Sequence, residues 1–253
     1  MPRNINILIP LPSYGFDPTE AAVPWNILTS NDIKITFATP NGAAAHGDEI
    51  MLSGKKLGIF KNLLKARKDG VEAYKLMSNS NEFKHPIPYD EIQPSVYDGI
   101  FLPGGHDKGV KEYLESKILQ NIIPDFFQNE KKIGAICHGV VLLARSKSKK
   151  TNKSVIYNYK TTALLKIQEL LAYNLTRLWL NDYYLTYPGM TVEDEVKSAL
   201  INPSNFIHGN LPIFRDADNY YKPGFVVKDR NYLSARWPGD IYTFSNEFLK
   251  LLT

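Results

Sequence analysis

The sequence predicts an α/β fold in which helices flank a mostly parallel β-sheet, and three observations support this. The chain opens with an apolar run at 4–9, a helix-like stretch at 17–28 and a β-rich run at 33–39, which is a strand–helix–strand order. A third apolar run, at 96–102, ends in Pro-Gly-Gly-His. A fourth, at 132–136, turns at Cys-His-Gly into an apolar, helix-compatible stretch. Parallel strands place functional groups at their carboxyl ends.

The elements of the first half follow from local signals. Asp17 is a helix N-cap candidate and Pro18 suits the first helical turn. Residues 56–77 carry apolar residues at helical spacing with lysines on the other face, and Gly70 is expected to break or cap that helix. We interpret 54–90 as a small helical cap inserted into a single domain, residues 1–253.

The second half combines helices with short strands. We expect an amphipathic helix at 112–129, a short strand at 155–157 and a helix at 161–173. The tyrosine-rich stretch 182–187 is either a strand or an extended loop. The remaining predicted elements are a short helix that starts near 193, a hairpin at 225–235 and a closing helix at 238–252.

Composition limits the function classes. The 253 residues carry a formal net charge of only +4, which does not by itself argue for nucleic acid. No apolar stretch approaches the ~18 residues of a membrane span. The single cysteine excludes an intramolecular disulfide and suits a reducing compartment. We therefore expect a cytoplasmic protein without nucleic-acid or membrane partners.

The one cysteine, Cys137, occupies the turn between a predicted strand and a predicted helix. Such a turn exposes its side chain at the top of a sheet. The amide groups of the following helix favour an anion there, so the thiol pKa is expected to be lowered. The alternative is a buried small hydrophobic residue, which free cysteines commonly are. The adjacent His-Gly and the strand-to-helix context favour a reactive thiol.

These motifs resemble those of the ThiJ/PfpI superfamily, within the class I glutamine amidotransferase-like fold. The resemblance covers residues 4–252 and is carried by Glu20, the segment Asp98–His106, the segment Ile133–Gly139 and the closing region near Ser234-Ala235-Arg236. It implies a flavodoxin-like, doubly wound three-layer sandwich. The insertion at 54–90 looks most similar to the long heat-shock chaperone/glyoxalase-like branch, and homodimers are common in such families.

The resemblance also implies roles for individual residues. Cys137 would be the nucleophile, and a protonated Glu20 would donate a hydrogen bond to its sulfur. His138 would act as general acid and base, and the backbone amides of Gly105 and His138 would form an oxyanion hole. Without the resemblance, Glu20 is a first-turn helix acid and His138 a hydrogen-bonded ring under a loop.

A third acid that orients His138 is sought in the cluster Glu193-Asp194-Glu195, with Glu193 preferred; its alternative role is helix N-terminal charge. A further set of residues is expected to shape the substrate pocket: Tyr14, His106, Tyr187 and Arg236. Core packing of the two tyrosines and a surface ion pair of the arginine are the alternatives. The histidines lack the spacing of a metal site, so no metal is predicted.

We therefore expect a cofactor-independent, cysteine-dependent enzyme that converts small reactive carbonyls, such as methylglyoxal to lactate, or removes them from glycated protein. Two alternatives use the same residues. One is a stress-response chaperone or redox sensor in which Cys137 is oxidised, and the other is an amidase or peptidase-type hydrolase. A glutaminase-type subunit is disfavoured because Gly209 and Asn210 follow His208, so the late His-x-Glu motif is missing.

Overall fold

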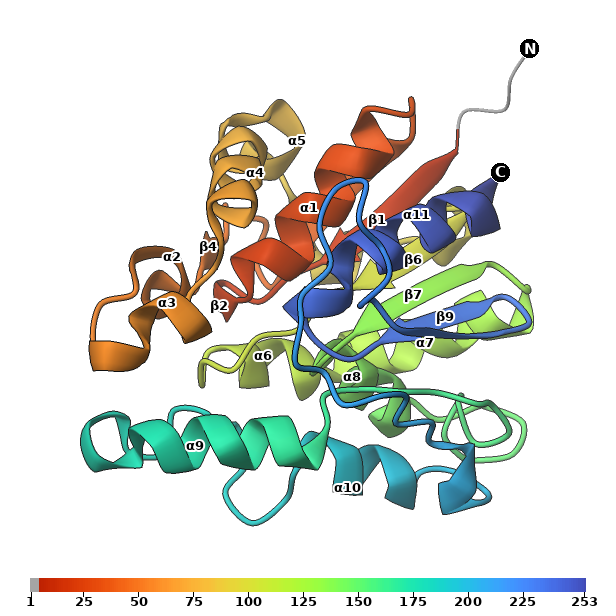
Figure 1. The fold of residues 1–253 in the computed structure, drawn as a ribbon. Helices are drawn as coiled ribbons and strands as arrows, with labels where there is room; N and C mark the ends of the chain where they lie inside the picture. Colours follow the sequence, from red (N-terminus) through yellow and green to blue (C-terminus); the bar gives the residue numbers. More distant parts are fainter. Residues whose placement is uncertain (1–4) are drawn as a thin grey trace.

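The computed structural model describes residues 5–253, and within this range one sheet of seven strands forms the centre of the molecule (Figure 1). Its order is β5-β3-β1-β6-β7-β9-β8, and every neighbouring pair is parallel except β8–β9. The strands are β1 (Asn6–Pro10), β3 (Lys34–Thr39), β5 (Ile87–Pro88), β6 (Gly99–Leu102), β7 (Lys132–Ile136), β8 (Val226–Asp229) and β9 (Tyr232–Ala235). A small second sheet pairs β2 (Tyr14–Phe16) with β4 (His46–Gly47).

Helices cover both faces of the central sheet, which gives the predicted α/β sandwich. Figure 1 shows α1 (Pro18–Thr29) beside α11 (Ile241–Leu252) on one face, while α7 (Lys117–Gln128) and α8 (Gly139–Arg145) pack on β7 from the other. The remaining helices are α2 (Glu49–Ser53), α3 (Lys61–Leu64), α4 (Lys68–Asn79), α5 (Asn81–Lys84), α6 (Val110–Leu114), α9 (Lys166–Leu180) and α10 (Val192–Ser198). Among residues 5–253, no helix combines the length and the hydropathy that crossing a bilayer would require.

The segment 54–90 is built differently from a continuous helix. The chain divides into a 3-10 turn at Gly58–Phe60, then α3 and α4, because Gly58 takes a φ of +55° and Lys65 is extended. Gly70 lies inside α4 and does not end it. A Cβ on Gly70 would lie 2.6 Å from Thr19 Oγ1, so the glycine allows α4 to pack closely on α1.

Two expectations for the middle of the chain are wrong. Residues 155–157 form a turn in which Tyr157 N donates to Ser154 O, although Val155 and Ile156 are buried. The helix expected at 161–173 begins later and runs from Lys166 to Leu180. Apolar side chains therefore predicted burial correctly but not the backbone conformation that achieves it. The hairpin of β8 and β9 and the closing helix α11 are confirmed.

Candidate active site

Cys137 lies at the carboxyl end of β7, in the turn that leads into α8. Its φ is +57°, and its N–H donates to Ala235 O of the neighbouring strand at 3.1 Å. The turn is tight because a Cβ on Gly139 would lie 2.1 Å from Leu102 O. A non-glycine residue in the left-handed region is unusual and points to a position fixed by its surroundings. The predicted strand–turn–helix geometry is therefore present around the only cysteine.

Three groups meet at Gly104, the first glycine after β6. A Cβ there would lie 2.6 Å from His138 N, 2.9 Å from Glu20 Oε2 and 3.0 Å from Cys137 Cβ. The N–H of Gly104 donates to Glu20 Oε2 at 2.8 Å. Glu20 reaches this point because Asp17 caps α1 by accepting the N–H groups of Thr19 and Glu20. Glycine at position 104 thus allows the acid and the thiol turn to approach each other.

The thiol and the acid are both buried, and both favour their protonated forms. Burial, together with the nearby carboxyls of Glu20 and Asp17, raises the pKa of the Cys137 thiol, so the lowering expected from the helix terminus does not occur. Cys137 is only 1% exposed. Burial likewise raises the pKa of the Glu20 carboxyl well above its usual range. A neutral Glu20 agrees with the protonated acid that the family resemblance implies.

A chain of hydrogen bonds fixes the tautomer of His138. Thr186 Oγ1 donates its one proton to His106 O at 3.0 Å, so it accepts from Nε2–H of His138, also at 3.0 Å. The other ring nitrogen, Nδ1, then carries a lone pair, and it lies 3.4 Å from Cys137 Sγ. Burial lowers the pKa of His138 well below its usual value, which keeps the ring neutral. His138 is therefore arranged to accept the thiol proton.

Thr186 is the partner that sequence reasoning missed. Its segment, 182–187, lies far from Cys137 in the chain and forms turns, not a strand. Two contacts just before the threonine anchor the segment: Tyr183 donates to Asp48, and Lys108 donates to Leu185 O. No local spacing signals such a contact; the only hint is a small hydroxyl residue among tyrosines.

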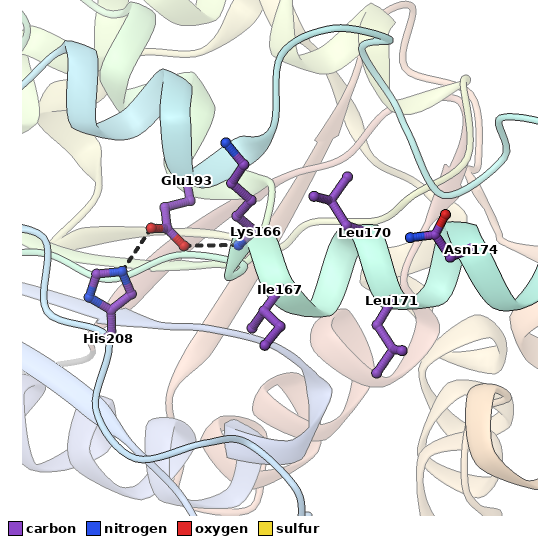
Figure 2. Close-up of a pocket in the computed structure, with 7 residues that line it drawn as sticks. All are labelled: Lys166, Ile167, Leu170, Leu171, Asn174, Glu193 and His208. Carbon is purple, nitrogen blue, oxygen red and sulfur yellow. Dashed lines mark hydrogen bonds and ion pairs between the residues drawn. The ribbon is translucent and has the colours of Figure 1, made fainter.

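Glu193, the acid expected to orient His138, has other partners. It lies in the first turn of α10, accepts the backbone N–H of Lys166 at 2.9 Å and pairs with His208 Nε2 at 2.7 Å (Figure 2). Lys197 also pairs with it, one helical turn along. The side chain borders a surface pocket along α9, and the structure gives His138 a hydroxyl partner instead of this carboxylate.

Three of the four residues expected in the pocket have other partners. Tyr187 donates to Glu115 and accepts from Arg145, at 2.8 Å each. Tyr14 is 40% exposed at the surface. The ion pair of Arg236 with Asp240 is present but fully buried, because the guanidinium also donates to carbonyl oxygens of the 208–210 loop. His106, in contrast, lines a cavity of about 320 Å³, and its ring contacts that of His138 with centroids 5.2 Å apart.

Of the two amides expected to form an oxyanion hole, that of His138 lies at the thiol, whereas the backbone of Gly105 packs against the 15–17 segment. Gly105 has a φ of +153°, and a Cβ there would lie 2.6 Å from Gly15 O. The N–H of His138 faces the sulfur of Cys137. Within residues 5–253, no group of three His, Cys, Asp or Glu side chains is arranged to hold a metal ion. The chemistry that this arrangement offers is therefore proton transfer between a thiol and an imidazole next to a neutral acid.

Comparison with known proteins identifies the family of the chain. A family model described as ThiJ/PfpI family-like matches residues 11–201. The chain belongs to the ThiJ/PfpI-like family. Among solved structures, glyoxalase III of Candida albicans superposes with a TM-score of 0.72 over 98% of this chain and 97% of that chain, at 18% identity. At this identity the likeness establishes the fold alone, which is the flavodoxin-like α/β fold of the family.

Curated ThiJ/PfpI relatives match parts of the chain. A glutathione-independent glyoxalase of Schizosaccharomyces pombe is 27% identical over 61% of this chain and 62% of its own length. A deglycase of Thermococcus kodakarensis is 26% identical over 66% of this chain and 69% of its own length. An uncharacterized protein of S. pombe is 29% identical over 49% of this chain, and the match spans 46% of that relative. These names support glyoxalase- or deglycase-like activity in the family of this chain.

Proposed function

We propose that the protein is a cofactor-independent enzyme that converts α-oxoaldehydes to 2-hydroxy acids, with methylglyoxal to lactate as the simplest case. The observation that carries the proposal is the fixed tautomer of His138, which presents the Nδ1 lone pair to Cys137 Sγ at 3.4 Å. Support comes also from the glyoxalase and deglycase relatives. A thiol that is neutral at rest needs such a base, because its own pKa is raised.

In the first step, Cys137 Sγ adds to the aldehyde carbon while its proton passes to His138 Nδ1. Proton loss is coupled to formation of the C–S bond, since burial disfavours a free thiolate next to a free imidazolium. The carbonyl oxygen becomes an oxyanion, which the N–H groups of Gly105 and His138 would stabilise. The proton then returns to this oxygen, and the product is a hemithioacetal on Cys137.

In the second step, His138 Nδ1 removes the hydrogen from the former aldehyde carbon and returns a proton to the neighbouring carbon through an enediolate. This isomerisation gives a thioester, which water hydrolyses to the 2-hydroxy acid and the free thiol. Water is the only co-reactant, so methylglyoxal plus water equals lactate. Glu20, being neutral, would donate to the sulfur whenever it leaves as a thiolate. Removal of adducts from glycated protein would share the first addition.

Redox sensing by Cys137 has less support. Oxidation by peroxide requires an exposed thiolate, whereas this sulfur is buried and its pKa is raised. The amidase-type alternative would use the same thiol and base, and a peptide substrate would need open access to a residue that is 1% exposed.

The test is lactate formation from methylglyoxal, measured beyond one equivalent per protein so that scavenging by lysine and arginine side chains is excluded. Wild-type protein should turn over, and Cys137→Ser should lower the rate at least about a hundredfold. As a matched control, Ser146→Cys adds a thiol at the other end of α8 and should not restore activity to Cys137→Ser. Absence of lactate with folded wild type would refute the proposal. Suppression of client aggregation by Cys137→Ser would then favour a chaperone.

A further inference from the structure

The cavity beside His106 is larger than methylglyoxal requires. It measures about 320 Å³ and lies between α9, the end of α2, α3 and the segments 212–215 and 237–238. At about 30 Å³ per water-sized group, the five heavy atoms of methylglyoxal fill roughly half of it. Its walls are mainly apolar, and Leu63, Leu171 and Ile213 are exposed along its rim. The cavity is therefore open to solvent and suits a ligand with a longer carbon chain.

Unpaired polar atoms are concentrated in this cavity. Four of its lining residues have a buried side-chain nitrogen or oxygen without a hydrogen-bond partner in the described part of the chain: His106 Nδ1, Gln168 Oε1, Tyr184 OH and Trp237 Nε1. Buried polar groups are normally paired, so such a group is explained when a ligand or water completes it. Each of these four atoms exposes less than 1 Å² to solvent, so they lie behind the cavity surface and mark a wall whose polar contacts are incomplete.

Arg215 provides a positive charge in the wall. Its guanidinium lies 5.2 Å from the ring centroid of Trp237 and donates to Leu63 O at 3.1 Å, and it forms no ion pair with any residue of the described range. Asp17 is the other charged lining residue. Its Oδ1 is occupied by the N–H groups that start α1, and burial raises the pKa of its carboxyl. Asp17 and Arg215 attract each other electrostatically, but they form no direct ion pair within the described range, so the guanidinium N–H groups that Leu63 O does not accept can donate to a ligand.

The geometry points to a substrate class: we propose that this cavity binds the distal carboxylate of an α-oxoaldehyde, with the Arg215 guanidinium as its donor. The aldehyde end would extend past His106, which lines the cavity and contacts the His138 ring. Arginine suits a carboxylate because its planar fork matches the two oxygens. The inference rests on the proposed function, since it names the substrate of the same thiol. Methylglyoxal would then be a truncated substrate.

The test compares two α-oxoaldehydes of similar length. The probe 4,5-dioxopentanoate carries a terminal carboxylate, 2-oxohexanal carries a methyl group there, and the first is converted to 2-hydroxyglutarate by addition of water. In wild type, kcat/KM for the carboxylate should exceed that for the neutral analogue at least about tenfold. In Arg215→Gln the ratio should fall to about one, and Arg215→Lys should keep part of it. A ratio within one variant is insensitive to its folded fraction.

Two results would overturn the inference: equal rates of both probes in wild type, or an unchanged ratio in Arg215→Gln. The matched control is Arg230→Gln, an arginine that lies outside this cavity, and it should keep the wild-type ratio. If no α-oxoaldehyde is converted, the proposed function fails. Calorimetry with 2-hydroxyglutarate then tests separately whether the cavity binds a carboxylate. Binding that Arg215→Gln abolishes supports the carboxylate site, and absence of binding to wild type refutes it.

Discussion

Replacing Thr186 with valine tests whether a hydroxyl, and not an acid, orients the base. Valine keeps the shape of threonine but removes the oxygen that accepts from His138 Nε2–H and donates to His106 O. Without that acceptor, nothing stabilises the His138 tautomer that carries its proton on Nε2. In the other tautomer Nδ1–H would face the thiol, and His138 could no longer accept the proton of Cys137.

The size of the effect follows from one hydrogen bond. Leaving a buried hydrogen-bonding group without its partner costs about 1–3 kcal/mol, and each 1.4 kcal/mol corresponds to about a factor of ten in rate. We expect kcat for methylglyoxal to fall roughly 10- to 100-fold in Thr186→Val. The free energy of unfolding should fall by about 1–3 kcal/mol as well, because His106 O loses its donor.

The assay combines lactate formation with alkylation of Cys137 by iodoacetamide, which reports the reactivity of the only thiol without any substrate. Thr186→Val should slow both, whereas Thr186→Ser keeps the hydroxyl and should stay within about threefold of wild type. Equal activity of the valine variant and wild type would refute the relay. So would equal losses in the serine and valine variants, which would indicate a packing role.

Three further changes have expected outcomes. Gly104→Ala places a Cβ 2.6 Å from His138 N and should abolish lactate formation with a loss of about 1–3 kcal/mol in unfolding free energy. Gly189→Ala, the control, meets no atom within 4 Å and is strained only by its φ of +91°, so it should stay active. Arg236→Met leaves the buried Asp240 carboxylate unpaired and should cost about 3–5 kcal/mol in urea unfolding; a loss below about 1 kcal/mol would contradict this. Burial raises the pKa of Glu169 to about 7 in the folded protein, above the value near 4.5 in the unfolded chain. The stability that the protonated carboxyl contributes is therefore complete below pH 4.5 and is lost as the pH rises through about 7. Glu169→Gln should therefore lose about 2–3 kcal/mol less than wild type between pH 5 and pH 8, and identical losses would refute the assignment.

The sequence predicted the sheet and the thiol turn because both depend on local patterns. Apolar runs of strand length identified β1, β6 and β7, and Cys-His-Gly marked the turn. The partner of His138 could not be found in this way, since Thr186 reaches it only through tertiary contacts of the 182–187 segment. The acid cluster at 193–195 was a reasonable choice by composition, but helix N-termini collect acids for their own electrostatic reasons.

The uncharged groups around Cys137 affect how the site can remain closed. A resting thiolate–imidazolium pair would need either contact with water or a large free-energy cost of desolvation. Thiol, imidazole, hydroxyl and carboxylic acid groups can all be buried in their uncharged forms at a much smaller cost. Charge separation is then delayed until a carbonyl is present to receive it. An idle molecule of this protein would accordingly be insensitive to electrophiles that are too large to reach the sulfur.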